Sequence, residues 1–425
     1  MLETVVIIYS IYTFMRIYIS VMQIGYINEQ KRKEPVLMAA GKYMVAGNYA
    51  VAKEKVALVE HFVDYLMFLW WVFAGFAWLS SLTQVEGEVT QAVLFLLGFV
   101  AINYIVGLPF ELYQKFKIDK EFRFNKMTPK MFIVDQLKSA VLFVVIGGAL
   151  FALLAWIITT FEMWWLWGFV AMFSIAVLAN VLMPWFMGLF NKFTPIEEGE
   201  LKREITKLME EAGLESDGIF VMDASKRDSR LNAFFGGLGK SKRVVLFDTL
   251  IEKLTTKEIL AVLGHELGHF KHGDIWKNIA LMGLLLFIAF YLFGHLPDEL
   301  FTQMHVIPHA GVKIAMLMLL LPLVSFVFNP LMSYVSQHNE YAADEYGSNV
   351  GGQEHLIAAL LKLVTENKSF PKSHPLVIFF YHTHPPIIER LNAMGYDASN
   401  TVIEEEKVEE PALPNDGIFA FIDKP

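Results

Sequence analysis

The chain has 425 residues, of which 55% are hydrophobic and 14% aromatic, and its mean hydropathy of +0.43 is too high for an ordinary soluble protein. The formal net charge of −9 argues against nucleic acid as a partner. Cysteine is absent, which excludes disulfides, thiolate metal ligands and cysteine nucleophiles. A metal site would therefore use histidine and carboxylate ligands. The lack of cysteine also favours a prokaryotic source.

Seven apolar runs are long enough to cross a bilayer, because about 20 helical residues span its hydrocarbon core. The first run lacks a basic leader and a small-residue cleavage site, so we expect a retained anchor rather than a signal peptide. Tryptophan and tyrosine near many run ends are typical of the membrane interface. The expected spans are 4–24, 62–82, 92–112 (interrupted by Pro109), 139–159, 164–186, 276–293 and 312–332.

The charges of the connecting segments predict the orientation of the spans. Connections 27–61 and 113–138 are rich in lysine and arginine, whereas 83–91, 160–163 and 294–311 carry neither residue. Basic connections stay on the cytoplasmic side of a membrane. We therefore expect the N-terminus outside, and the C-terminus and the long segment 187–275 in the cytoplasm.

Segment 187–275 is predicted to be a soluble insert. A helix through 201–209 ends near Gly213, and three strand-like runs follow at 219–222, 232–235 and 243–247. We expect a small antiparallel sheet just before the next helix. An exposed edge strand of that sheet could bind an extended peptide, although the sheet could equally serve only to brace the helix.

The sequence His265-Glu266-Leu267-Gly268-His269 matches the H-E-x-x-H pattern of zinc metallopeptidases. Residues four apart lie on one face of a helix, so both imidazoles can bind one metal ion. Glu266 is then placed to act as general base in hydrolysis. The alternative is a chance match on a buried helix.

A catalytic zinc ion usually has three protein ligands, and this motif supplies two of them. His272 is unsuitable as the third, because its position at the end of the motif directs it away from the metal face. Glu340 and Asp344 are four residues apart and follow the last span, so a helix would present both on one face. Glu340 can coordinate the metal while Asp344 accepts a hydrogen bond from a ligand imidazole. The alternative is an ordinary acidic helix face.

Taken together, these motifs resemble those of the integral-membrane zinc proteases called type I CAAX prenyl endopeptidases. Order and spacing agree over nearly the whole chain, and seven spans distinguish this family from the related four-span heat-shock membrane proteases. The matching motifs are 124–126 (FNK), 230–236 (RLNAFFG), 245–250 (VLFDTL), 265–269 (HELGH), 340–344 (EYAAD), 384–386 (HPP) and 389–391 (ERL).

The resemblance implies a water-filled chamber enclosed by the seven helices, with the zinc site facing into it. It implies Glu340 as third ligand and Glu266 as base. It also implies that His384 and Arg390 lie near the site, with His384 donating to the developing oxyanion. Arg390 would hold Glu340, Asp344 or substrate in place. Asn232 and Ala233 would belong to the strand that pairs with substrate.

We therefore predict a polytopic α-helical membrane protein with seven transmembrane helices around a chamber and a small cytoplasmic metalloprotease α+β insert. The predicted activity is zinc-dependent endopeptidase cleavage, resembling that of proteases that remove the C-terminal tripeptide of prenylated CAAX proteins. The substrate is expected to be a peptide or protein, with or without a lipid, and the enzyme is expected to use one Zn²⁺ per chain in a bacterial inner membrane. The predicted segments are 1–186 (spans one to five), 187–275 (insert with the zinc helix), 276–335 (spans six and seven), 336–400 (third ligand and C-terminal catalytic segment) and 401–425 (acidic tail).

Two alternatives remain open at this stage. A quality-control protease for membrane proteins would share the chemistry but would not require a prenyl group. A zinc-binding transporter would explain the polar residues inside the expected spans, such as Arg16 and Asn103. Glu266, between two metal ligands, has no coordinating task in a transporter, which favours the protease.

Overall fold

The computed structural model describes residues 1–213, 218–236 and 243–397, so the predicted acidic tail lies outside the described residues. Seven described helical segments are long and apolar enough to cross a membrane, which confirms the expected number of spans. The first five comprise α1 (Leu2–Gln30), α2 (Ala40–Trp70), η1 (Trp71–Gly75), α3 (Phe76–Leu82), α4 (Glu88–Tyr113), η2 (Gln114–Ile118), α5 (Asp119–Glu121), α6 (Pro129–Leu142), η3 (Phe143–Gly147), α7 (Gly148–Thr160) and α8 (Trp164–Met187). The last two are α12 (Asp274–Gly294) and α14 (Ala310–Gly351).

One detail of the expected spans is wrong. Pro109 does not interrupt the third span, because it lies inside α4 and the helix continues to Tyr113. Membrane helices tolerate an internal proline when neighbouring groups satisfy the carbonyl that it leaves free.

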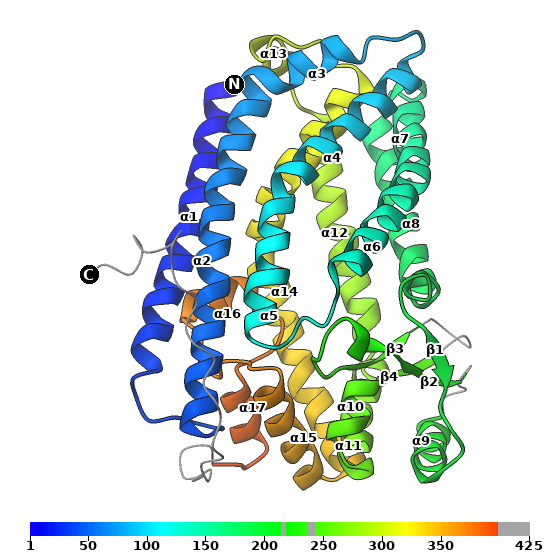
Figure 1. Cartoon of the computed structure of the whole chain (residues 1–425). Coiled ribbons are helices and arrows are strands. Elements are labelled where there is room, and N and C mark those ends of the chain that lie inside the picture. The colour runs from blue at the N-terminus through cyan, green and yellow to red at the C-terminus, as the bar shows by residue number, and fades with distance from the viewer. Residues whose placement is uncertain (214–217, 237–242, 398–425) are drawn as a thin grey trace.

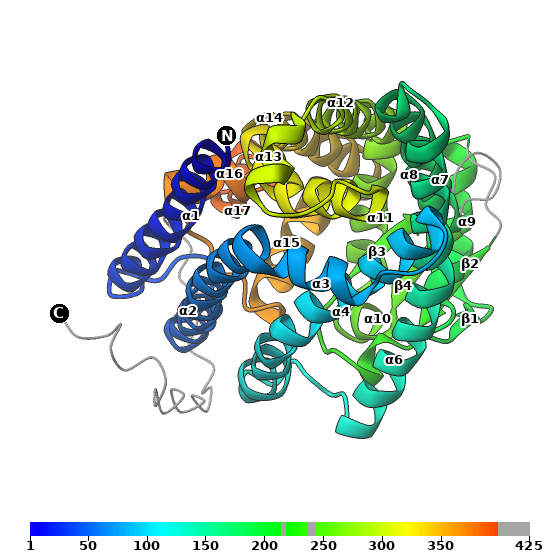
Figure 2. The ribbon, with the colours of Figure 1, turned by 90° about the horizontal axis from the view of Figure 1, so that it is seen from above.

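The long helices follow one another around the circumference of the molecule (Figure 2). The N-terminus, α3 and the short α13 (Asp298–Gln303) lie at one end (Figure 1). The small sheet, α9 (Glu200–Glu211), α10 (Asp248–Lys253), α11 (Thr256–Lys271), α15 (Gln353–Glu366) and α17 (Ile387–Ala393) lie at the other end. The connections without lysine or arginine therefore gather at the end opposite the H-E-x-x-H helix.

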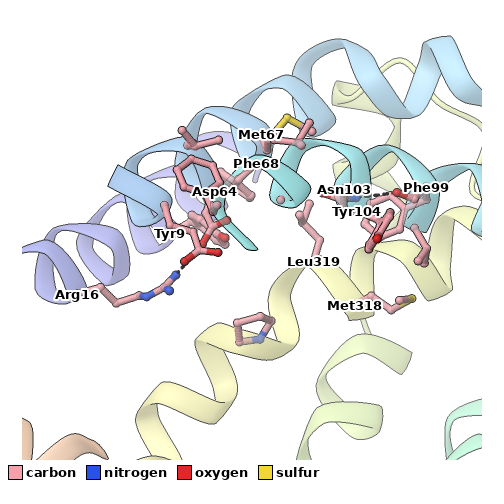
Figure 3. A pocket seen from close by; sticks show the side chains of 17 residues that line it. Tyr9, Arg16, Asp64, Met67, Phe68, Phe99, Asn103, Tyr104, Met318 and Leu319 are labelled. Carbon is pink, nitrogen blue, oxygen red and sulfur yellow. Dashed lines mark hydrogen bonds and ion pairs between the residues drawn. The ribbon is translucent and has the colours of Figure 1, made fainter. Parts of the chain in front are cut away.

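The interior of the span region contains polar side chains as well as apolar packing. A cavity of about 440 Å³ lies between α1, α2, α4 and α14 (Figure 3). Arg16 of α1 and Asp64 of α2 form an ion pair of 3.3 Å at its wall. Asn103 of α4 accepts a hydrogen bond of 3.2 Å from the indole nitrogen of Trp71. At least part of the intramembrane polarity is thus satisfied within the bundle.

The sheet differs from the expected one in two ways. It has four described strands, β1 (Phe193–Pro195), β2 (Ile219–Met222), β3 (Ala233–Gly236) and β4 (Arg243–Phe247), in the order β1-β2-β4-β3. Strands β2 and β4 are parallel, whereas the other two pairs are antiparallel, so the predicted purely antiparallel sheet is wrong. The additional strand β1 lies at the edge of the sheet, where its Pro195 is tolerated because no ladder hydrogen bond is required of it on the open side.

Helix α14 continues well beyond the membrane. Its 42 residues extend about 63 Å, roughly twice the ~30 Å hydrocarbon core, and it ends where Gly352 adopts a φ of 90°. We expected a segment boundary at residues 335 and 336, but the helix runs through this position without a break. The seventh span and Glu340 therefore belong to one continuous helix.

Candidate active site

The site lies where α11 crosses α14. Helix α11 begins with a capping box, in which Thr255 and Glu258 each bond the other's backbone amide. Its glycines allow the two backbones to touch: a Cβ atom on Gly268 would lie 2.8 Å from Cα of Ala343. A Cβ atom on Gly347 of α14 would lie 2.8 Å from the amide nitrogen of His265. This close approach brings the histidines of α11 next to the carboxylates of α14.

Replacing Gly268 with alanine tests this contact. We expect the free energy of unfolding to fall by about 1–3 kcal/mol and metal content to decrease, because the obstructing atoms belong to backbone that cannot move aside locally. Thermal unfolding in detergent and metal analysis measure both effects. Gly25→Ala is the matched control, since nothing lies within 4 Å of its added Cβ atom. Equal stability of the two variants would contradict the packing argument.

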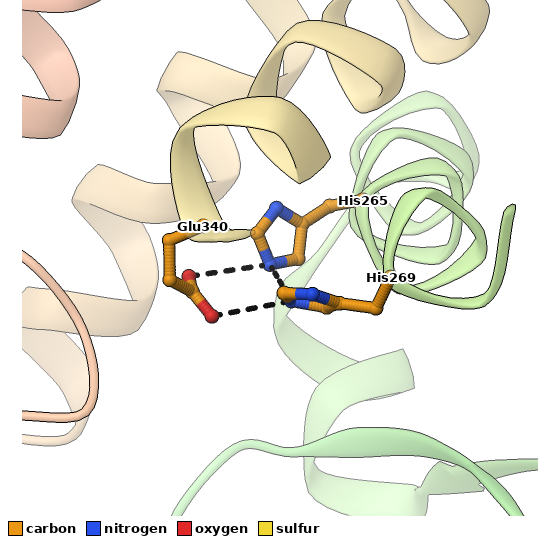
Figure 4. A group of neighbouring side chains, drawn as sticks. All are labelled: His265, His269 and Glu340. Atoms are coloured by element: carbon orange, nitrogen blue, oxygen red, sulfur yellow. Dashed lines mark hydrogen bonds and ion pairs between the residues drawn. The ribbon is translucent and has the colours of Figure 1, made fainter. Parts of the chain in front are cut away.

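Three side chains from the two helices present ligand atoms to one point (Figure 4). The Nε2 atoms of His265 and His269 are 3.2 Å apart. The carboxylate of Glu340 approaches Nε2 of His269 to 3.1 Å through Oε1 and Nε2 of His265 to 3.5 Å through Oε2. A tetrahedral metal centre with bonds of about 2.0–2.1 Å places ligand atoms about 3.3 Å apart. These residues therefore fit a metal ion.

A second carboxylate lies behind each imidazole. Nδ1 of His265 is 2.9 Å from Oδ1 of Asp344, and Nδ1 of His269 is 2.9 Å from Oδ2 of Asp274. Both carboxylates are buried, with 3% of each residue exposed. The contact of His269 is a hydrogen bond. A carboxylate that accepts the Nδ1 proton leaves the lone pair of Nε2 free to bind a metal.

Sequence reasoning identified Asp344 but missed Asp274. The sequence did contain a signal for Asp274, because this residue follows His269 by only five positions. In the structure Asp274 is the first residue of α12, and Gly273 before it adopts a φ of 69°. The ammonium group of Lys277 lies 2.7 Å from Asp274 and 3.0 Å from the amide oxygen of Asn339. The start of the sixth span is thereby tied to α14.

Asp274→Asn should weaken metal binding about 10–100-fold, because the charge that orients and polarises His269 is lost. Competition with a chromophoric chelator measures the affinity. Asp298→Asn, on an exposed residue of α13 at the opposite end of the molecule, is the control. An unchanged affinity in Asp274→Asn would contradict this role.

Arg390 of α17 connects two buried acidic residues of α14, Asp344 and Glu340. Its Nε and one terminal nitrogen donate to the Asp344 carboxylate at 2.7 and 2.6 Å. Its other terminal nitrogen lies 3.2 Å from Oε2 of Glu340. Only 7% of Arg390 is exposed. A buried, two-pronged pair of this kind fixes both carboxylates in position.

Glu266 and His384 complete the group of predicted residues. Burial raises the pKa of Glu266 above its usual range, although the neighbouring His265 and His269 oppose that shift. His384 Nε2 lies 3.3 Å from Oε1 of Glu340, and its side chain is 62% exposed. His384 is thus accessible to a bound molecule.

Asn232 and Ala233 lie at the start of β3, the edge strand of the sheet, against which α11 packs. Ala233 is buried and Asn232 is exposed. The structure thus gathers His265, Glu266, His269, Glu340, Asp344, His384 and Arg390 in one place, with an open strand edge beside the helix that bears three of them.

Known proteins resemble the chain along most of its length. Residues 195–397 match Peptidase family M48, and residues 34–192 match the family described as CAAX prenyl protease N-terminal, five membrane helices. CAAX prenyl protease 1 of Saccharomyces cerevisiae is 33% identical over 84% of each chain. The CAAX prenyl protease 1 homolog of Homo sapiens is 30% identical over 82% of each chain. A crystal structure of S. mikatae Ste24p superposes with a TM-score of 0.83 at 31% identity, covering 92% of this chain and 97% of that one.

Fold, site and relatives together define an integral, multi-pass membrane metalloendopeptidase that acts on peptide or protein substrates. The family implies a metal ion, for which the two histidines and Glu340 provide a group of ligands. The chain belongs to the CAAX prenyl protease 1 family within the M48 peptidases.

Proposed function

We propose that the protein is a zinc endopeptidase that binds one Zn²⁺ per chain through His265, His269 and Glu340. The observation that carries this proposal is the approach of three side chains, two imidazoles and one carboxylate, whose nearest atoms lie 3.1–3.5 Å apart and which come from two helices in backbone contact. Two imidazoles and one carboxylate are a common ligand set of catalytic zinc. When bound, zinc acts as a Lewis acid on the peptide carbonyl group and on water.

In this proposal Glu266 takes a proton from the attacking water and passes it to the leaving amine nitrogen. The raised pKa of Glu266 suits both steps, because a carboxyl group that holds its proton more tightly is a stronger base. His384 donates a hydrogen bond to the carbonyl oxygen as negative charge develops there, and its exposure leaves it free to meet substrate. Asp344, Asp274 and Arg390 hold the ligands in position.

The free edge of β3 binds the substrate in extended form, with the backbone of Ala233 and the side chain of Asn232 at the contact. The names of the relatives support a substrate that carries a prenyl group and a C-terminal CAAX-type tail. We propose that the reaction removes the last three residues of that tail, as the resemblance to the prenyl endopeptidases implies. An acidic chain of net charge −9 supports the absence of nucleic acid among the partners.

We further propose that the end carrying α11 faces the cytoplasm and that the N-terminus lies outside. The connections without basic residues share one end with the N-terminus, as the positive-inside rule requires. The lack of cysteine supports a bacterial inner membrane.

Cleavage of a farnesylated CAAX peptide and of its unfarnesylated twin, with and without chelator, tests the function. We expect chelator-sensitive release of a tripeptide from the lipidated peptide, restored by zinc. Equal cleavage of both peptides would remove the lipid requirement and favour turnover of membrane proteins. No cleavage of either by the zinc-loaded protein would contradict the peptidase itself.

A further inference from the structure

The hydrogen-bond pattern of β3 identifies which backbone groups face its open edge. Ala233 pairs with Leu246 of β4, and Asn232 accepts a hydrogen bond of 3.1 Å from the amide of Phe247. In antiparallel pairs, residues alternate between facing the partner strand and facing away from it. The amides and carbonyls of residues 232, 234 and 236 therefore point to β4, and those of residues 231, 233 and 235 point to the open edge. At this edge the Ala233 amide donates to Oδ1 of the neighbouring Asn232 at 2.9 Å.

At residue 231 this edge is already closed. The Leu231 amide donates to Oδ1 of Asn367 at 2.8 Å, and Nδ2 of Asn367 donates to the Leu231 carbonyl at 3.1 Å. A single side chain thus makes both hydrogen bonds that a neighbouring strand would make at this position. Asn367 directly follows α15 and comes from a segment 136 residues away in sequence.

The segment that leads into β3 is also fixed on its other sides. The Arg230 side chain donates to the hydroxyl of Tyr49 at 2.6 Å and to Oδ1 of Asp119 at 2.9 Å. Its carbonyl accepts a bond of 2.9 Å from the Thr249 hydroxyl. Leu231 therefore cannot shift to offer its backbone to another chain while Asn367 remains in place.

We propose that Asn367 is a register stop: it ends the substrate-pairing edge at Ala233 and so limits how many substrate residues lie beyond the cleaved bond. This inference rests on the proposed function, and it makes Asn367 a positioning residue that sets specificity for product length. A substrate segment pairs along residues 233 and 235, where its carbonyl replaces Oδ1 of Asn232 as the acceptor for the Ala233 amide. It meets the Asn367 carboxamide where the next pair of bonds would form.

The direction of the substrate follows from the same edge. Antiparallel pairing is the arrangement that β3 already makes with β4, and it is the more stable one per residue. An antiparallel substrate presents its C-terminal side to the beginning of β3. The neighbouring Lys368, whose ammonium group lies 4.0 Å from the ring centroid of Phe124, places positive charge at the end where a C-terminal carboxylate arrives.

Peptides that differ only in the number of residues after the cleaved bond, from two to six, test the stop. We expect the full-length wild-type enzyme to favour three residues. In Asn367→Ala the ratio of kcat/KM for six residues to that for three should rise about fivefold or more, because each backbone hydrogen bond gained is worth about 1 kcal/mol. Asn367→Asp, which keeps the acceptor for the Leu231 amide and loses the donor, should give a smaller rise. Mass spectrometry identifies the bond cut.

The ratio compares two substrates of the same enzyme preparation. A misfolded fraction of a variant lowers both kcat/KM values equally and therefore leaves the ratio unchanged. Gln353→Ala is the matched control, because Gln353 likewise bonds a backbone carbonyl, that of Met394, at the other end of α15. An unchanged ratio in Asn367→Ala would overturn the inference and leave the proposed function standing. The same conclusion would follow if the variant responded to peptides lengthened before the cleaved bond and not to peptides lengthened after it. Failure of the wild-type enzyme to cleave any peptide would overturn both.

Discussion

Glu266→Gln should retain its metal ion and lose about 10²–10⁴-fold in kcat, the usual contribution of a general base. The amide preserves the size of the side chain but cannot accept a proton from water. Glu266 is not among the three residues whose atoms converge on the metal position, so metal content should stay near one ion per chain. Peptide hydrolysis and metal analysis on the same preparation give both quantities.

Glu345→Gln serves as the control for this prediction. It removes an equal charge from an exposed position directly after Asp344, and should leave activity unchanged. Activity of Glu266→Gln within tenfold of wild type would exclude Glu266 as the base. Loss of metal together with activity would show instead that Glu266 supports the ligands.

Arg390→Leu should lower the free energy of unfolding by about 3–5 kcal/mol, because removal of one partner leaves the other buried charge without compensation. Asp344 and Glu340, each 3% exposed, both lie against the guanidinium group. Metal affinity should fall as well, since the two carboxylates would repel each other. Denaturant unfolding in detergent, with and without metal, measures the change.

Arg390→Lys tests the geometry separately from the charge. Lysine keeps the positive charge but cannot donate to both oxygens of Asp344 in a fixed plane, so it should recover only part of the stability. Arg32→Leu is the control, because it removes an exposed arginine on the connection after α1 and so measures the effect of losing an arginine that is not buried. Equal stabilities of Arg390→Leu and Arg32→Leu would contradict the buried pair.

The sequence predicted the features that depend on neighbours along the chain. Apolar runs of span length gave the seven helices, and the four-residue spacing of His265 and His269 placed both imidazoles on one face. Glu340 was predicted as the third ligand because Glu340 and Asp344 repeat that spacing.

Features set by distant segments could not be read in this way. The parallel pairing of β2 with β4 depends on a connection whose path the sequence does not specify. Asp274 belongs to no known motif. Its contact with His269 depends on the turn at Gly273, which places the first residue of α12 next to that imidazole. Asn367 is an ordinary helix-end residue until the fold brings it to Leu231.

The continuity of α14 has a consequence for how the protein is made. The histidines of α11 emerge from the ribosome before the last two spans, but Glu340 follows the apolar stretch of the seventh span, and His384 and Arg390 come later still. The group of His265, His269 and Glu340 is therefore complete only after all seven spans have been synthesised. We expect a growing chain that carries only the H-E-x-x-H motif to be inactive as a peptidase during its own insertion.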